Sequence, residues 1–135
     1  MAQKYYVCKI CGNLVEAINE SGVSMVCCGQ NMTVLEPCST DGIAEKHVPE
    51  VKVDGNSVKV VIGEIEHPMV EAHYIEWISI ETKNGSQRKK LKPGDAPKAE
   101  FMLADGDELI AVYEHCNIHG LWKKAVNKSE ESGNE

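Results

Sequence analysis

The chain has 135 residues, enough for one ordinary domain or for a small domain followed by a compact second one. Its formal net charge of −7 argues against a nucleic-acid-binding surface, which needs clustered basic residues. No stretch approaches the roughly 20 apolar residues of a membrane span. The first residues contain no apolar export segment, so we expect a cytoplasmic protein that binds neither membranes nor nucleic acids.

Residues 1–36 are predicted to form a small unit of short strands. Strands are expected at 5–7, 14–18 and 23–26, with a turn at 19–22. So short a segment buries too little apolar area to fold alone, and a bound metal would supply the missing stability. Turn-forming residues at 37–44 indicate a linker.

Residues 45–126 are predicted to form a second domain of strands and turns. Runs of β-branched and aromatic residues predict strands at 58–62, 74–80, 99–103 and 109–113, and Asn84-Gly85 predicts a hairpin. Short strands at this spacing favour a small antiparallel β-sandwich, which makes the expected fold class all-β. The polar residues 127–135 predict a disordered tail.

Six cysteines in a chain without an export signal call for a chemical explanation. Because disulfides are rare in a reducing cytosol, clustered cysteines there more often bind a metal or react. Cys38 stands apart from the other five and is interpreted as a small apolar residue or a thiol without a role in either site.

The first candidate metal site consists of Cys8, Cys11, Cys27 and Cys28. Four thiolates in a tetrahedral arrangement suit zinc or iron, and a zinc ribbon is the main alternative. A ribbon normally has a second Cys-x-x-Cys pair, whereas Cys27 and Cys28 are adjacent. Successive side chains of an extended chain point in opposite directions, so both bind one metal only with distorted angles. We expect a redox-active iron to tolerate this distortion, which favours iron.

The second candidate site consists of His47, His67, His73, Cys116 and His119. Imidazole suits iron, copper and zinc, while a thiolate favours softer or redox-active metals. A blue-copper site would use two histidines, Cys116 and Met69. An iron site with four imidazoles and one thiolate uses all five residues and leaves a sixth position open, so we favour iron. His115 precedes Cys116 in a predicted strand and should face away from the metal.

Seven motifs spread over nearly the whole chain are highly specific in combination. They are Cys8-Lys9-Ile10-Cys11-Gly12-Asn13, Cys27-Cys28, Glu45-Lys46-His47-Val48-Pro49, His67-Pro68-Met69, Tyr74-Ile75-Glu76-Trp77-Ile78, Leu91-Lys92-Pro93-Gly94-Asp95-Ala96-Pro97 and Cys116-Asn117-Ile118-His119-Gly120-Leu121-Trp122. In these motifs the chain resembles desulfoferrodoxin, the two-domain form of superoxide reductase. The resemblance implies a desulforedoxin-like domain, which holds one iron through four cysteines, followed by an immunoglobulin-like β-sandwich with a second, catalytic iron.

The same resemblance implies a role for each residue of the second site. It makes His47, His67, His73 and His119 equatorial ligands and Cys116 the axial thiolate. Glu45 resembles the carboxylate that closes the open position in the resting ferric state. Lys46 is expected to attract superoxide and to orient a water for its protonation.

The implied activity is the one-electron reduction of superoxide to hydrogen peroxide without formation of dioxygen. Electrons are expected from a rubredoxin-like donor, and the chain is expected to form a homodimer. Two alternative functions are a non-enzymatic electron carrier, which would not react rapidly with superoxide, and a dismutase. A dismutase would also release dioxygen and would need no external electrons.

Overall fold

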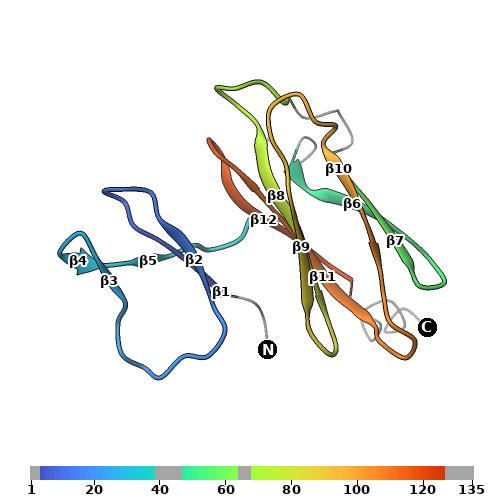
Figure 1. The fold of residues 1–135 in the computed structure, drawn as a ribbon, viewed down its shortest axis with the longest axis horizontal. Coiled ribbons are helices and arrows are strands. Elements are labelled where there is room, and N and C mark those ends of the chain that lie inside the picture. Colours follow the sequence, from blue (N-terminus) through green and yellow to red (C-terminus); the bar gives the residue numbers. More distant parts are fainter. Residues whose placement is uncertain (1–3, 39–46, 64–67, 127–135) are drawn as a thin grey trace. The chain divides into compact units, whose positions relative to one another are not determined.

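The computed structural model describes residues 4–38, 47–63 and 68–126. The chain divides into two compact units, Met1–Glu36 and Pro37–Glu135, and both are built from β-strands (Figure 1). The expected all-β fold, with a small cysteine-containing unit followed by an antiparallel β-sandwich, is confirmed. Within the described ranges, no helix has the length and apolar character needed to cross a membrane.

The first unit contains two small antiparallel sheets. Its strands are β1 (Lys4–Val7), β2 (Leu14–Ala17), β3 (Val26–Cys27), β4 (Gln30–Asn31) and β5 (Thr33–Val34). Strand β1 lies between β2 and β5, and β3 pairs with β4. Tyr5 and Cys8 are the only buried apolar side chains among the described residues of this unit. This small apolar core agrees with a unit whose stability depends on a bound metal.

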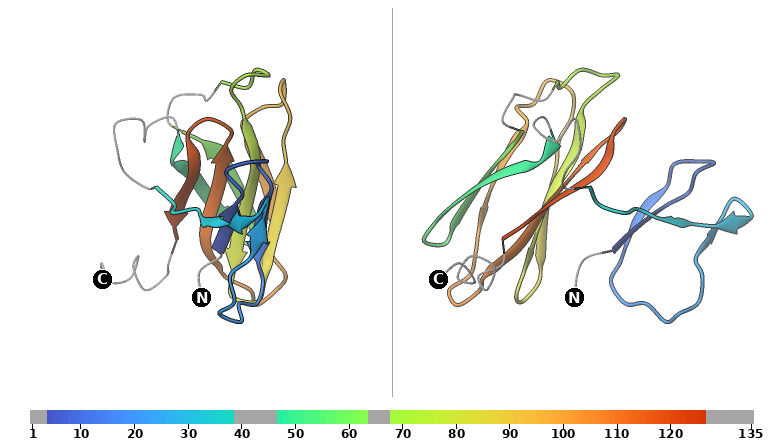
Figure 2. Two further views of the ribbon diagram at one scale, coloured as in Figure 1. Left: turned by 90° about the vertical axis from the view of Figure 1, so that its left-hand side faces the viewer. Right: turned by 180° about the vertical axis from the view of Figure 1, so that it is seen from behind.

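The second unit is a sandwich of two antiparallel sheets (Figures 1 and 2). Its strands are β6 (Pro49–Asp54), β7 (Ser57–Ile62), β8 (Ile75–Thr82), β9 (Ser86–Lys90), β10 (Lys98–Met102), β11 (Leu109–Cys116) and β12 (Gly120–Ala125). One sheet has the order β10-β7-β6 and the other the order β12-β11-β8-β9.

The core of the sandwich forms because both sheets turn apolar side chains toward the space between them. In β7, Val58, Val60 and Ile62 are fully buried while Lys59 and Val61 between them are exposed, as a half-buried strand requires. Ile78 of β8 and Phe101 of β10 belong to the same core cluster. Burial of each such side chain contributes about 1.5–3 kcal/mol.

Four strand predictions for the second unit fall on β7, β8, β10 and β11, but the patterns did not indicate β6, β9 or β12. Strand β9 is exposed at every residue and carries no apolar alternation. It forms because the Asn84-Gly85 turn folds it back along β8, where Thr82 and Gly85 are hydrogen-bonded. The strand expected at 23–26 is also shorter than predicted, since only Val26–Cys27 is extended and paired.

Candidate metal centres

The four cysteines of the first unit converge on one point. The sulfur atoms of Cys8, Cys11, Cys27 and Cys28 all lie within 4.8 Å of one another. The Sγ atoms of Cys11 and Cys27 are 3.6 Å apart. Two thiolates of a tetrahedral metal site with metal–sulfur bonds of about 2.3 Å lie about 3.8 Å apart. The donor atoms and their spacing therefore fit one tetrahedral metal ion.

The Cys8–Cys11 segment forms a tight turn that directs backbone N–H groups at sulfur. Gly12 donates from its N–H to the carbonyl of Cys8 (2.8 Å) and has a φ of 85°, which favours glycine. The N–H of Cys11 donates to the sulfur of Cys8 at 3.5 Å. The side-chain amide of Asn13 donates to the sulfur of Cys27 at 3.5 Å. These contacts place donors where thiolate charge would lie.

An unusual backbone conformation brings the adjacent cysteines to the same site. Cys28 has a φ of 54°, the only positive value for a non-glycine residue in the described part of the chain. With Gly29 (φ 78°) it forms the two-residue turn between β3 and β4, and positive φ at both positions is the pattern of a type I′ hairpin. The turn removes Cys28 from strand alternation, so its side chain lies beside that of Cys27. A strained residue of this kind costs about 1–3 kcal/mol.

The clustered thiols have different pKa values. A hydrogen bond from the backbone of Cys11 lowers the pKa of Cys8 to about 6. The side chain of Cys11 raises the pKa of Cys28 to about 12 and also raises the pKa of Cys27. Because metals bind the thiolate form, loading of the site must displace the protons of Cys27 and Cys28. Metal affinity at this site therefore falls as the pH falls.

The second cluster lies at one end of the sandwich and combines three imidazoles with one thiol. His47 precedes β6, His73 precedes β8, Cys116 ends β11 and His119 lies in the turn before β12. One donor atom from each of these residues lies within 4.8 Å of the others. His67, Glu45 and Lys46, also predicted for this site, lie outside the described residues.

The spacing of the imidazole nitrogens fits a metal ion. Nε2 of His47 and Nδ1 of His119 are 3.0 Å apart. Two neighbouring nitrogen ligands at about 2.1 Å from one metal, bound at a right angle, are about 3.0 Å apart. The buried thiol of Cys116 completes a donor set of nitrogen and sulfur, which suits a transition metal. Together with the cysteine cluster, this arrangement is consistent with two metal centres in the chain.

Asn117 joins the loop of Cys116 to the loop of His73. Its side-chain oxygen accepts from the N–H of Tyr74 (2.9 Å), and its side-chain amide donates to the carbonyl of Ala72 (3.1 Å). Its own N–H donates to the carbonyl of Tyr74 (3.2 Å). The three bonds fall on the two residues that flank His73 and hold that ligand beside Cys116.

Two residues behind the ligands were not identified as site residues by the sequence analysis. The ring of Trp122 stacks on that of His47 (4.9 Å between centroids, 11° between planes) and donates its N–H to the carbonyl of His119 at 3.1 Å. Glu114 is fully buried, and one of its oxygens lies 3.4 Å from Nδ1 of His47. The signal for Glu114 was a charged residue in an apolar strand, two positions before Cys116.

Glu114 is placed to act on His47 from the side opposite to the other ligands. Burial raises the pKa of Glu114 well above its ordinary value. Neither of its oxygens has a hydrogen-bond partner among the described residues. A carboxyl group next to the outer nitrogen of a histidine orients the ring and increases its basicity when the inner nitrogen binds a metal. The position of Glu114 therefore also fits a metal at His47.

Opposing effects act on the pKa of the Cys116 thiol. Burial raises the pKa of its thiol, and hydrogen bonds from the backbone N–H groups of His119 and Ile118 lower it by a smaller amount. His115 is not part of the cluster. Its Nδ1 lies 2.6 Å from a carboxylate oxygen of Glu76, and its ring stacks on Trp77.

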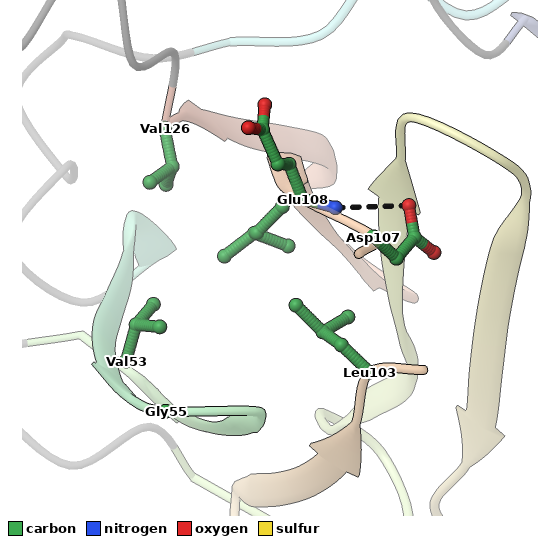
Figure 3. A pocket seen from close by; sticks show the side chains of 7 residues that line it. Val53, Gly55, Leu103, Asp107, Glu108 and Val126 are labelled. Carbon is green, nitrogen blue, oxygen red and sulfur yellow. Dashed lines mark hydrogen bonds between the residues drawn. The ribbon is translucent and has the colours of Figure 1, made fainter. Parts of the chain in front are cut away.

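The pocket drawn in Figure 3 lies at the other end of the sandwich. It has a volume of about 220 Å³ and is lined by apolar side chains including Val53, Leu103 and Val126, with Asp107 and Glu108 at its margin. The pocket also includes Leu109, which begins β11, whereas Cys116 ends that strand. At about 3.3 Å per residue, the pocket is about 23 Å from the cluster. The second cluster, where the exposed His119 reaches solvent, is thus separate from this pocket.

Comparison with known proteins identifies the family. Residues 39–125 match the family Desulfoferrodoxin, and residues 2–35 match the desulfoferrodoxin N-terminal domain. The chain belongs to the desulfoferrodoxin family. The resemblance seen in the sequence motifs is therefore confirmed.

Individual members of the family align over most of their length. A desulfoferrodoxin homolog of Archaeoglobus fulgidus is 47% identical over 118 residues, covering 87% of this chain and 93% of the relative. The desulfoferrodoxin of Nitratidesulfovibrio vulgaris is 46% identical, with 87% and 92% covered. The crystal structure of the superoxide reductase from Treponema pallidum superposes with a TM-score of 0.76 at 32% identity, covering 91% of this chain and 97% of that one.

The two clusters should load independently. We expect Cys28→Ser to lose the metal of the cysteine cluster and to keep the metal of the other cluster, because it removes one of the four thiolates. Elemental analysis of the purified variant measures this as a fall from two metals per chain to one. Cys38→Ser is the matched control, since Cys38 is exposed and belongs to neither cluster. Loss of both metals in Cys28→Ser would contradict independent loading.

Glu114 should strengthen metal binding through His47. We expect Glu114→Gln to weaken metal affinity at the second cluster about 10–100-fold, because the amide keeps the shape of the side chain but cannot become negative. Competition with a chelator, followed separately for each cluster, measures the change. Glu100→Gln, at an exposed position of β10, should leave both affinities unchanged. Equal affinities in the two variants would show that Glu114 has no such role.

Proposed function

We propose that this desulfoferrodoxin is a superoxide reductase. In this reaction superoxide takes up one electron and two protons and leaves as hydrogen peroxide, and no dioxygen forms. The observation that carries the proposal is the cluster of Cys116 with three imidazoles at one end of the sandwich. The match to the superoxide reductase of Treponema pallidum over nearly the whole chain supports the same reaction.

We further propose that both centres contain iron. Residues 1–36 would form a desulforedoxin-like domain that binds one iron through Cys8, Cys11, Cys27 and Cys28. Residues 45–126 would form the catalytic domain, with the second iron bound by His47, His67, His73, His119 and Cys116. Iron at this second site would supply the electron that superoxide takes up, changing from the ferrous to the ferric state. Family membership supports iron over zinc in both places.

The chain controls the state of the Cys116 sulfur. Burial raises the pKa of the Cys116 thiol and so favours its protonated form. A cation at the cluster favours the thiolate. The backbone N–H groups of Ile118 and His119 stabilise that negative charge, and the core around Cys116 excludes water from it. A bound cation and these N–H groups would together favour the thiolate against the effect of burial.

Superoxide is an anion, and a chain with a net charge of −7 repels it at long range. The ligands differ in exposure: His47 and Cys116 are buried, and His119 is exposed. We propose that superoxide arrives on the exposed side, attracted by Lys46, which also orients a water for protonation. Glu45 would close the open position between turnovers. Both residues precede His47 directly in the sequence, which supports their nearness to the cluster.

Each turnover consumes one electron, so a donor is required. We propose a rubredoxin-like protein in this role and a cytoplasmic location for the reaction. None of the six cysteines forms a disulfide, as is usual for proteins of reducing compartments.

Exposed apolar side chains on the first unit support a homodimer. Ile18, Val23 and Val26 are 87%, 81% and 63% exposed in this small unit. A second copy that covers them would remove apolar surface from water. We expect sedimentation velocity of the iron-loaded chain to show a dimer, which Ile18→Ser with Val23→Ser weakens. A control with Val70→Ser, on the second unit, should stay dimeric, and a monomeric unsubstituted chain would refute the proposal.

Rapid mixing of the reduced, iron-loaded protein with superoxide tests the function directly. The iron spectrum, peroxide and dioxygen are followed together. We expect oxidation close to the diffusional limit of about 10⁸–10⁹ M⁻¹s⁻¹, with one peroxide formed per superoxide and no dioxygen. Dioxygen in dismutase proportion would instead indicate dismutation. A second site that stays reduced would leave only electron transfer by the cysteine-bound centre.

Variants in the same experiment test the attraction of superoxide by Lys46 and the ligand role of Cys116. Lys46→Ala should slow oxidation at low ionic strength, because it removes local positive charge that attracts the anion. Lys52→Ala, at an exposed position of β6, is the control of equal net charge. Cys116→Ser should lose the thiolate-to-iron absorption of the oxidised site. Retention of that absorption would refute the ligand role of Cys116.

A further inference from the structure

The chain carries a concentrated positive segment that the reaction itself does not use. Residues 82–94 include five basic residues and no acidic residue, although the net charge of the chain is −7. Four of them, Arg88, Lys89, Lys90 and Lys92, are here called the basic edge. They lie on or directly after β9, which is exposed at every residue and is an edge strand of its sheet.

The basic edge lies close to the second cluster and is separated from it by neighbouring strands of the same sheet. Lys90 lies opposite Trp77 of β8, and Trp77 lies opposite His115 of β11. His115 directly precedes Cys116. Neighbouring strands are about 4.8 Å apart, so the backbone of Lys90 is about 10 Å from the strand that ends in Cys116.

Side-chain contacts connect β9 with β8 and β8 with β11. The rings of Trp77 and His115 stack at 5.8 Å between centroids with 11° between their planes. The guanidinium of Arg88 lies over the Trp77 ring at 5.8 Å from its centroid. The loop after the basic edge also returns toward the ligands, because the N–H of Gly94 donates to the carbonyl of Met69 at 2.9 Å. The packed rings thus extend from the basic edge to His115, the residue before Cys116, and the loop after the edge is hydrogen-bonded to Met69, in the segment that precedes the ligand His73.

We propose that the basic edge is the docking surface for an acidic one-electron protein that reduces the second centre. This inference rests on the proposed function, because a reductase requires one external electron for each superoxide. The docked donor loses one electron, and the oxidised centre gains that electron. No proton or bond is transferred between the two proteins.

Charge complementarity is the reason for assigning an acidic electron donor to the basic edge. A negatively charged donor is repelled by the chain as a whole and needs a local surface of opposite sign. Of the acidic groups nearby, Asp95 is 3.6 Å from Lys92 and Glu76 is paired with His115. Lys89 packs over the ring of Phe101, a contact that leaves its charge in place. The positive charge of Lys89 and Lys90 is therefore available to a partner.

Lysines on an edge strand also have a simpler explanation. They prevent the open edge from pairing with a strand of another molecule. That role requires charge at the edge and predicts no effect on electron transfer. The two explanations therefore differ in what a reversal of charge does to the donor.

The experiment compares two double variants of the iron-loaded full chain. Lys89→Glu with Lys90→Glu reverses the basic edge. Lys52→Glu with Lys59→Glu reverses two exposed lysines that face each other across β6 and β7, in the other sheet. Both variants have the same net charge. The probe is a rubredoxin of net negative charge, and its affinity is titrated calorimetrically at low and high ionic strength. The rate at which reduced rubredoxin reduces the oxidised second centre is measured in parallel.

We expect the reversed basic edge to lower the affinity and the second-order reduction rate about tenfold or more at low ionic strength. The deficit should shrink at high ionic strength, where exposed charges are screened. The β6–β7 variant should remain within about twofold of the unsubstituted chain. If both variants lose affinity and rate equally, the effect is one of net charge. If the basic-edge variant loses neither, the lysines serve only to protect the edge from pairing. Either result overturns the proposal.

The proposed function is tested separately on the same samples. Both variants should still form one peroxide per superoxide when mixed in the reduced state. If the unsubstituted protein fails that test, the superoxide reductase function falls while the binding titration still reports on docking. If it passes and the basic-edge variant binds rubredoxin normally, only the docking surface is refuted.

Discussion

The arrangement of the side chains of the second cluster depends on the antiparallel register among β8, β11 and β12. This register places Cys116 opposite Ile75 on one side and Gly120 on the other. His73, which precedes β8, and His119, in the turn after β11, are thereby brought to the same end of the sheet. A slip of one residue would turn Cys116 to the other face and separate it from the imidazoles. The hydrogen bonds of Asn117 secure this register at the point where it matters for the ligands.

Both clusters contain features that are unfavourable in the chain by itself. Cys28 occupies the left-handed region in which a cysteine is strained, and Glu114 is buried without a hydrogen-bond partner among the described residues. A metal ion would compensate for both, since Cys28 would bind it as a thiolate from the strained turn and the ring of His47 beside the buried carboxyl would be polarised by it. Local features that oppose stability therefore coincide with the metal-binding residues, as expected where function rather than stability selects the residue.

Charge has two separate tasks in the proposed reaction. An acidic chain must attract both an anionic substrate and an acidic electron donor, and a single positive surface would make them compete. Lys46 precedes the ligand His47, whereas Lys89 and Lys90 lie on the edge strand two strands away from Cys116. In this arrangement the donor binds at the sheet edge formed by β9, and superoxide approaches from the solvent-exposed side of His119. The donor, oxidised once it has given up its electron, does not have to leave before superoxide reacts.

Much of the fold could be predicted because its signals are local. The β-branched residues at 58–62 indicated a strand before any partner was known, and they form β7. The hairpin at Asn84-Gly85 was equally clear. Strand β9 could not be predicted, since its polar residues have no pattern of their own and become a strand only by pairing with β8. Cysteine spacing indicated the four-thiol site, but the left-handed turn that unites Cys27 and Cys28 depends on the pairing of β3 and β4.

The sequence by itself determined which donor atoms the protein offers: two groups of cysteines and histidines in separate parts of the chain. It also determined where β7, β8, β10 and β11 lie, because both properties are read from neighbouring residues. Only the tertiary structure decided that Nε2 of His47 faces Nδ1 of His119, that Trp122 stacks on His47, and that Glu114 lies behind it. These contacts join residues up to 75 positions apart. They exist because strand pairing and core packing, which act across the whole domain, bring those segments together.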